Sequence, residues 1–238
     1  MRANVSLERC VSFINCHAGG AGKGSYLGEV PPPRWFVTLS RQGGCNAHGI
    51  AEHLAALLQK RELDQACQWT VFDRELVKKV LDEHHLPQRL RDFMPEDRHS
   101  EIADILEELC ELHPATETLV RQTIDTVLRL AELGGCILIG RAANVVTRKL
   151  RNGFHVRLIG SLETRVQRMM EYEKLDRAAA QARLHEQDKA RARFVKKYFH
   201  VDVEAAENYH LVLNTDHFTA QQSAHLIAEG VLQLAPKR

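Results

Sequence analysis

A glycine-containing turn lies between an apolar segment and a segment with helical periodicity. Residues 35–39 are mostly apolar, residues 40–49 form a polar turn that contains three glycines, and apolar residues then recur at helical spacing over 50–58. A strand, a glycine turn and a helix point free backbone N–H groups and a helix N-terminus at an anion. A nucleotide phosphate is the usual anion at such a place, so this segment predicts a phosphate-binding loop.

The predicted loop lacks the lysine of the common nucleotide-binding motif. No Lys follows its glycines, so the pattern Gly-x-x-x-x-Gly-Lys-Ser/Thr is absent there. A second glycine-rich segment, residues 17–25, contains Gly22-Lys23, but His17 occupies the position of the first glycine and prolines follow at 31–33. This favours a flexible linker; the alternative is that Lys23 reaches a phosphate bound elsewhere. The loop at 40–49 therefore indicates nucleotide binding rather than proving catalysis.

Polar pairs recur where the predicted strands end. They are Ser40-Arg41, Asp73-Arg74, Gly140-Arg141 and Gly160-Ser161. Three of the four contain arginine, whose guanidinium binds phosphate oxygens in pairs. Ligands of parallel sheets gather beyond the carboxyl ends of the strands. The pairs therefore predict one crevice for a ligand with several phosphates.

Short apolar segments alternate with helical ones along the chain. The predicted strands are 35–39, 69–72, 136–139, 154–159 and 210–213. The predicted helices are 50–58, 74–81, helices within 88–133 that end at Gly134-Gly135, then 162–170, 175–200 and 217–234. This alternation predicts an α/β fold with a parallel sheet covered on both faces. Residues 1–34, a short helix and a Gly/Pro-rich linker, are expected to form an appendage to the domain 35–238.

Composition restricts the class of protein. The 238 residues carry a formal net charge of +1, with 44% hydrophobic and 26% charged residues, as in ordinary globular domains. Such a balance argues against non-specific nucleic-acid binding, and no apolar run is long enough to cross a membrane. We therefore expect a cytoplasmic protein whose six scattered cysteines are reduced thiols, several of them in the core. Cys110 and His113 have a metal-like spacing but no second pair, which favours packing.

Five segments in order resemble the P-loop nucleoside monophosphate kinases, and most closely the cytidylate kinase-like family. They are VTLSRQGGCNAHGIAEHLA (37–55), VFDRELVKKVL (71–81), ILIGRAANVV (137–146), DKARARFVKKYF (188–199) and YHLVLNT (209–215). The resemblance extends over about residues 35–232. It implies a three-layer P-loop kinase-like domain with a parallel five-stranded sheet, a helical insertion at about 74–133 and a lid at about 175–200.

The resemblance also implies roles for individual residues. The ATP phosphates would contact Ser40, Gly43, Gly44, Cys45, Asn46, Ala47 and His48. The transferred charge would be offset by Arg41, Arg191 and Arg193. The acceptor would contact Asp73, Arg74, Arg141 and Asp188. ATP and Mg²⁺ are the implied cofactors, and no residue is assigned as a metal ligand.

Structural roles are the alternatives for several of these residues. Arg41 would then pair with a surface carboxylate, Asp73 would cap the helix that follows it, and 188–197 would be a solvated helix face. The sequence also departs from the family, because Asn46 replaces a glycine, Ala47 stands at the position of the lysine, and no Ser or Thr lies near Gly49.

Three functions follow from these residues. The first is a kinase that transfers phosphate from ATP to a nucleoside monophosphate, with CMP or dCMP as the best family guess. The second is a nucleotide-binding regulatory protein on the same fold with weak or no kinase activity. The third is an interaction protein that binds a partner through its N-terminal helix and helical insertion. We expect nucleotides as partners, no membrane and no nucleic acid, and a homodimer is left open.

Overall fold

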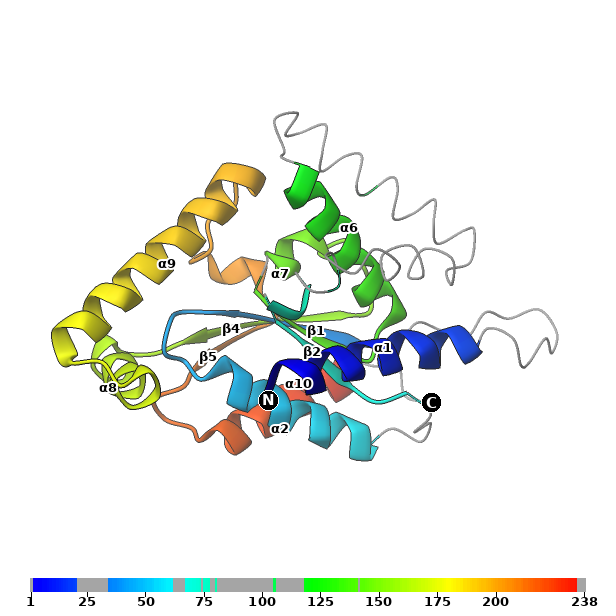
Figure 1. The fold of residues 1–238 in the computed structure, drawn as a ribbon, viewed down its shortest axis with the longest axis horizontal. Helices are drawn as coiled ribbons and strands as arrows, with labels where there is room; N and C mark the ends of the chain where they lie inside the picture. Colours follow the sequence, from blue (N-terminus) through cyan, green and yellow to red (C-terminus); the bar gives the residue numbers. More distant parts are fainter. Residues whose placement is uncertain are drawn as a thin grey trace.

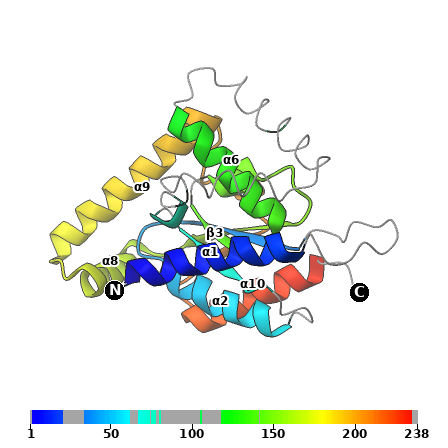
Figure 2. The ribbon, with the colours of Figure 1, turned by 45° about the vertical axis from the view of Figure 1, so that its right-hand side comes forward.

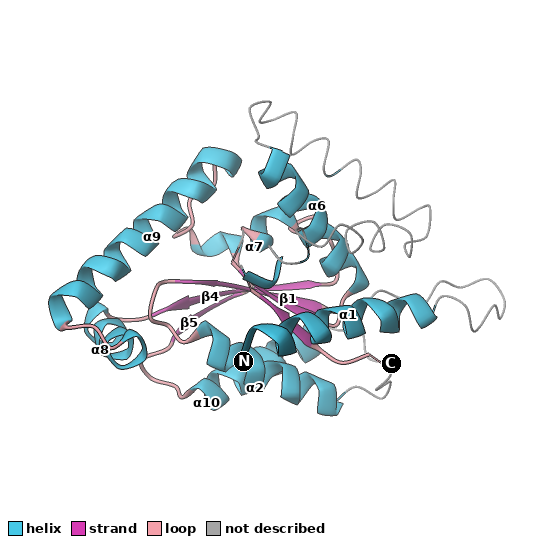
Figure 3. Cartoon of the chain, viewed as in Figure 1, coloured by secondary structure: helices cyan, strands magenta, loops and turns pink. Residues whose placement is uncertain are grey.

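A parallel sheet forms the centre of the molecule (Figures 1 and 3). The computed structural model describes residues 2–20, 34–61, 67–73, 75–77, 80, 105, 118–140 and 142–234. The strands are β1 (Phe36–Arg41), β2 (Thr70–Phe72), β3 (Cys136–Ile139), β4 (Gly153–Ile159) and β5 (Leu211–Asn214). All neighbouring strands are parallel and their order is β2-β3-β1-β4-β5. The predicted α/β fold with five parallel strands is confirmed.

Helices cover both faces of this sheet. Helices α2 (Ala47–Arg61) and α10 (Ala220–Leu234) lie on one face, below the sheet in Figure 1, where alternate β1 residues such as Val37 and Leu39 contact them. Helices α6 (Thr118–Leu133) and α7 (Ala143–Val146) lie on the other face with Phe36 and Leu138. Every residue of β3 is buried, as its continuous apolar sequence predicts.

A helical hairpin projects from the end of the sheet. It consists of α8 (Leu162–Glu173) and α9 (Arg177–Phe199), and a short 3₁₀ helix η1 (Ala206–Asn208) precedes β5. The Asp176 side chain accepts a hydrogen bond from the Ala179 N–H at the start of α9. Val166, Met169, Ala180 and Leu184 form a small core of their own between the two helices. The lid expected at 175–200 thus coincides with α9.

The N-terminal helix packs closely on the rest of the molecule. Helix α1 (Arg2–Gly20) is longer than expected and includes residues 17–20, which the sequence assigned to a linker. Its Cys10, Phe13 and Ile14 are buried in the core that also contains Phe72, and the Phe13 and Phe72 rings meet edge to face. In Figures 1 and 2 this helix, in dark blue, runs across the sheet near β2. The helix expected near the start of the chain is thus longer than predicted, and one of its faces packs into the core.

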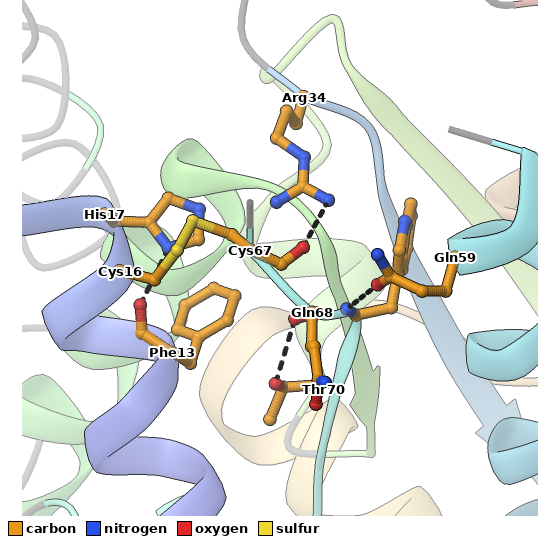
Figure 4. The surroundings of a disulfide bond; sticks show 9 residues. Phe13, Cys16, His17, Arg34, Gln59, Cys67, Gln68 and Thr70 are labelled. Atoms are coloured by element: carbon orange, nitrogen blue, oxygen red, sulfur yellow. Dashed lines mark hydrogen bonds between the residues drawn. A yellow bond between two sulfur atoms is a disulfide. The ribbon is translucent and has the colours of Figure 1, made fainter. Parts of the chain in front are cut away.

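A disulfide joins this helix to the segment before β2, and the expectation of six reduced thiols is wrong at these two positions. Cys16 and Cys67 are bonded across 51 residues, with their Cα atoms 5.6 Å apart (Figure 4). Packing of α1 beside β2 brings the two together, and scattered positions along a sequence do not reveal such a tertiary contact. Cys10, Cys45 and Cys136 are free and buried, as expected of core cysteines.

Some expectations fall outside the described residues. They include Lys23, the Cys110–His113 spacing, and residues 81–104 and 106–117 of the helical insertion. Within the described part of the chain, none of the helices has the length and apolarity that a membrane span requires.

Candidate functional site

The predicted phosphate-binding loop lies between the end of β1 at Arg41 and the start of α2 at Ala47. Gly44 has φ 79° and Asn46 has φ 51°, so two residues of the loop are in the left-handed region. A Cβ atom on Gly44 would lie 2.7 Å from the Arg165 carbonyl oxygen, so only glycine fits there. Asn tolerates left-handed backbone better than most residues. The replacement of a family glycine by Asn46 therefore keeps the turn.

Gly49 accommodates the side chain of Asn46. A Cβ atom on Gly49 would lie 2.7 Å from Asn46 Oδ1 and 2.9 Å from Nδ2. The carboxamide thus occupies the space beside the first turn of α2 that a side chain at position 49 would need. The side chain at position 46 and the glycine at position 49 are therefore structurally coupled.

The carboxylate of Asp188 connects this loop to α8 and α9. Asp188 Oδ1 accepts hydrogen bonds from the Gly43 N–H at 2.7 Å and from Arg191 Nη2 at 2.6 Å. Its Oδ2 accepts from Arg165 Nη1 at 2.7 Å. Burial acts to raise the pKa of Asp188, but the bonds from Arg191, Gly43 and Arg165 together lower it below its usual value. Asp188 therefore holds the loop and orients Arg191.

A cavity of about 660 Å³ opens in front of the loop. All the residues from Arg41 to His48 line it, together with Arg168 and Tyr172 of α8 and Gln187 and Arg191 of α9. Six of the seven residues predicted to contact the donor phosphates, Gly43 to His48, therefore lie on one cavity. We call this the donor-side cavity.

A second cavity of about 590 Å³ lies on the other side of Arg41. It is lined by Ser40, which was predicted on the donor side, and by Gly140, Asn144, Arg157 and Arg183. We call it the acceptor-side cavity for its place across Arg41 from the loop, although neither Asp73 nor Asp188, which were expected to contact the acceptor, lines it. Arg41, Gln187 and Arg191 line both cavities, so two of the three predicted catalytic arginines lie between them. The Nε of Arg191 is buried and has no hydrogen-bond partner among the described residues.

The remaining predicted residues have different surroundings. Arg193 is on the exposed side of α9 and lines neither cavity, while Arg74 and Arg141 lie outside the described residues. Asp73 caps the following segment, because its Oδ1 accepts from the Leu76 N–H at 2.8 Å. Its Oδ2 lies 3.5 Å from His48 Nε2, next to the loop. The capping role and a place at the site are thus compatible.

Sequence reasoning missed three arginines at the site. Arg157 of β4 is buried, donates to Ser40 Oγ at 3.0 Å and pairs with Glu204. Arg165 is also buried and donates to the carbonyl oxygens of Gly43 and Gly160. Arg168 donates to Thr215. For Arg157 the sequence did contain a signal, namely an arginine within the apolar run FHVRLI at 154–159. A charge in a buried strand requires polar partners, so it marks a polar site.

The residues beside the loop provide few oxygen ligands for Mg²⁺, the cofactor that the family implies. Cys45, Ala47 and His48 carry no hydroxyl, and Asp188 is bonded to the loop. The other carboxylates nearby are Glu171 and Glu173, which line the donor-side cavity, and Asp73, which lies beside His48. No group of three or more His, Cys, Asp or Glu side chains in the described ranges is arranged to bind a metal. Mg²⁺ usually keeps several waters and binds one or two carboxylates together with substrate phosphates. These oxygen ligands therefore fit a metal that arrives bound to a nucleotide, with Asp73, Glu171 and Glu173 as the nearby carboxylates.

The parallel sheet with a loop at the carboxyl end of its central strand defines a P-loop kinase-like fold. The chain belongs to the cytidylate kinase-like family, whose family model matches residues 36–217. This membership points to a nucleotide kinase-like function.

Two further similarities are weaker. Over 122 residues the chain is 29% identical to a uronate isomerase of Corynebacterium glutamicum, a match that covers 51% of this chain and 23% of that protein. The chain thus spans less than a quarter of this curated relative. A solved structure of an uncharacterized protein from Eubacterium ventriosum has a TM-score of 0.62 and 15% identity, covering 84% of this chain and 99% of that one. This likeness supports the fold alone.

Proposed function

We propose that the protein transfers the γ-phosphoryl group of ATP to a nucleoside monophosphate, with CMP or dCMP as the acceptor. The observation that carries the proposal is the position of Arg41 and Arg191, which line both cavities. In phosphoryl transfer the donor and acceptor must lie in line on either side of the transferred group. Cations between the two sites then offset charge on its equatorial oxygens.

Each group has a defined part in this reaction. An acceptor phosphate oxygen attacks the γ-phosphorus, the bond to the oxygen that bridges the β- and γ-phosphates breaks, and ADP leaves with that electron pair. The loop from Gly43 to His48 holds the donor phosphates, and Arg41 and Arg191 stabilise the transferred group. Asp73, Arg74 and Arg141 hold the acceptor in this proposal. Bound Mg²⁺ would supply further positive charge at the phosphates.

Asp188 has a positioning role in this proposal. Its carboxylate already accepts bonds from Gly43, Arg165 and Arg191. The negative charge of this carboxylate would repel a phosphate, so we do not expect Asp188 to contact the acceptor directly. We propose instead that Asp188 holds the loop at Gly43 and orients the guanidinium of Arg191.

A coupled assay of ADP formation tests the reaction. Purified protein is incubated with ATP, Mg²⁺ and each of CMP, dCMP, UMP, AMP and GMP in turn. We expect turnover with CMP or dCMP and its loss in Arg41→Ala and Arg191→Ala. Turnover that is the same in these variants and in the parent protein contradicts the proposed site, and turnover with another monophosphate alone contradicts the proposed acceptor.

A nucleotide-binding regulatory protein is the second candidate, favoured by the loop itself. Ala47 stands where the family has lysine, and the Gly43 N–H is already bonded to Asp188. Loss of one electrostatic donor costs about a hundredfold in rate or more. Thermal stabilisation by ATP without ADP formation supports this candidate, since a ligand of the folded state raises stability. Stabilisation accompanied by turnover at a rate typical of a kinase, about 1 per second or more, contradicts it.

A further inference from the structure

A third cavity, of about 380 Å³, lies apart from the phosphate-binding loop. Its walls are α7 with the turn that follows it on one side, and residues 207–210 before β5 on the other. Ligand cavities are roughly 300–1,000 Å³, so this one suits a small metabolite. Asn144 is buried and lines both this cavity and the acceptor-side cavity, which makes the two neighbours.

Two arginines give this cavity a positive rim. Arg148 and Arg151 are exposed on the turn after α7, and neither pairs with a carboxylate of the described residues. Two unpaired guanidinium groups three positions apart attract anions and bind phosphate oxygens through fixed pairs of donors. Glu207 is the one acidic side chain among the lining residues.

Two uncharged histidines, His155 and His210, also line this cavity. The His155 backbone N–H donates to His210 Nδ1 at 2.9 Å, and the two rings stack with centroids 5.0 Å apart. Because His210 Nδ1 accepts this bond, the proton of the neutral ring is on Nε2, which becomes a donor. Burial and then the neighbouring His210 lower the pKa of His155 to about 4, and burial also lowers the pKa of His210. Both rings are therefore neutral at pH 7, and the arginines carry the positive charge.

We propose that this cavity binds a small phosphate monoester of about the size of a sugar phosphate. The phosphate contacts Arg148 and Arg151, and the uncharged part of the ligand lies against the rings of His155 and His210. One water molecule occupies about 30 Å³ of liquid. The cavity, at about 380 Å³, is many times larger, so it has room for more than a phosphate ion alone. This site goes beyond the proposed kinase reaction and does not depend on it.

Amide NMR of the full chain tests the proposal without ATP. The probes are ribose 5-phosphate, inorganic phosphate and ribose at constant ionic strength, and the readout is the His155 amide, which is bonded directly to the His210 ring. We expect a saturable shift with ribose 5-phosphate, weaker binding of inorganic phosphate and no shift with ribose. The proposal is overturned if none of the three probes moves this resonance.

Variants assign the signal to the cavity. Replacing both arginines, Arg148→Ala with Arg151→Ala, should weaken ribose 5-phosphate binding at least about tenfold, because charged hydrogen bonds are lost. Glu207→Gln should tighten it about two- to threefold by removing a nearby negative charge. Lys149→Ala is the matched control, since Lys149 has the same charge on the same turn and does not line the cavity. Unchanged affinity in the double variant, or in Glu207→Gln when the double variant does not fold, contradicts the site.

A further variant separates this site from the phosphate-binding loop. Arg41→Ala changes the donor- and acceptor-side cavities but not this one. The His155 response should persist in Arg41→Ala even if that variant loses all phosphoryl transfer. Disappearance of the response in Arg41→Ala would assign the binding to the loop and would remove the case for a separate site.

Discussion

The donor-side and acceptor-side cavities share Arg41 and Arg191 but are built in different ways. The donor side combines the loop from Gly43 to His48, in which Gly44 and Asn46 have left-handed backbone, with side chains of α8 and α9 such as Arg168 and Tyr172. The acceptor side consists of side chains from separate elements, such as Asn144 of α7, Arg157 of β4 and Arg183 of α9. One side thus depends on the course of the main chain and the other on the identity of particular residues.

This difference explains which departures from the family pattern the fold tolerates. Asn46 changes a side chain of the loop and keeps the backbone that a glycine would adopt. A backbone phosphate site can therefore persist while its sequence motif disappears. The acceptor side does not tolerate such changes, because loss of the buried Arg157 removes the partner of Glu204 and leaves Ser40 Oγ, among the described residues, with the Tyr209 hydroxyl alone.

The largest expected effect is at Arg191, which serves both cavities. Arg191→Ala should lower the rate of phosphoryl transfer about a hundredfold or more, because an electrostatic donor between the two phosphates is lost. The measurement is kcat for ADP formation with CMP as acceptor. Arg193→Ala provides the comparison, since Arg193 is two residues further along α9 and lines neither cavity. Equal losses in both variants would show that α9 acts through its overall charge.

The next effect is at Asp188, which joins the backbone-built side to Arg191. Asp188→Asn keeps the shape but removes the charge that pairs with Arg165 and Arg191. We expect the free energy of unfolding to fall by about 2 kcal/mol, as for a partly buried ion pair that loses one partner. Both nucleotide affinity and turnover should fall with it, which urea unfolding and the ADP assay would measure. A change in turnover without any change in stability would place Asp188 in contact with substrate instead.

The same variant has a defined pH dependence. The bonds from Arg191, Gly43 and Arg165 depress the pKa of Asp188 in the folded state, against the effect of burial. Its stabilisation is therefore complete above the unfolded pKa of about 3.9 and is lost as the pH falls through the folded pKa. Stability of the parent protein should thus fall below about pH 4 more steeply than that of Asp188→Asn. Parallel curves would mean that Asp188 is not bonded in this way in solution.

The elements that build the backbone were predictable from sequence. Buried parallel strands need continuous apolar runs, and CILI at 136–139 is both such a run and β3 itself. The glycine turn predicted the loop at 42–46, and Gly134-Gly135 predicted the end of α6 at Leu133. These features are local, so neighbouring residues in the sequence contain the information.

The contacts that assemble the side-chain part were not predictable in the same way. The Asp188 carboxylate meets Gly43 across 145 residues, and Arg157 meets Glu204 across 47. The Cys16–Cys67 bond likewise requires α1 to pack beside β2. One sequence states which side chains can form such bonds but does not say which ones the tertiary fold brings together.

A smaller effect is expected at the coupled pair Asn46 and Gly49. Asn46→Ala keeps a Cβ atom in left-handed backbone but removes the polar group that favours it, which should cost about 1 kcal/mol. Gly49→Ala should have a smaller effect, because its Cβ would lie 2.7 Å from Asn46 Oδ1, the movable end of a side chain, and Ala is favoured over Gly in a helix. Combining Gly49→Ala with Asn46→Gly removes this clash.

A double-mutant cycle on the free energy of unfolding checks that coupling. The loss of free energy of unfolding caused by Gly49→Ala should be smaller in the Asn46→Gly variant than in the parent chain, by about 0.5 kcal/mol or more. Strict additivity would show that the loop adjusts to either residue independently. It would also weaken the distinction between a backbone-built donor side and a side-chain-built acceptor side.

The smallest effect on either cavity is expected at the disulfide. Cys67 precedes β2 and thus lies at the amino edge of the sheet, opposite the carboxyl ends where both cavities open. Cys16→Ser should lower the free energy of unfolding by about 2–4 kcal/mol, because a loop of 51 residues is no longer closed in the unfolded chain. Turnover and nucleotide affinity below the unfolding transition should stay the same.

A reducing agent breaks the same disulfide without a mutation, so the parent protein can be compared with and without it. Reductant should lower the thermal midpoint of the parent protein and leave that of Cys16→Ser unchanged. If reduction instead lowers turnover while the protein remains folded, α1 influences the site through β2, whose last residue, Phe72, packs on Phe13 and precedes Asp73. The N-terminal helix would then act through Asp73, which lies 3.5 Å from His48 of the loop and lines neither cavity.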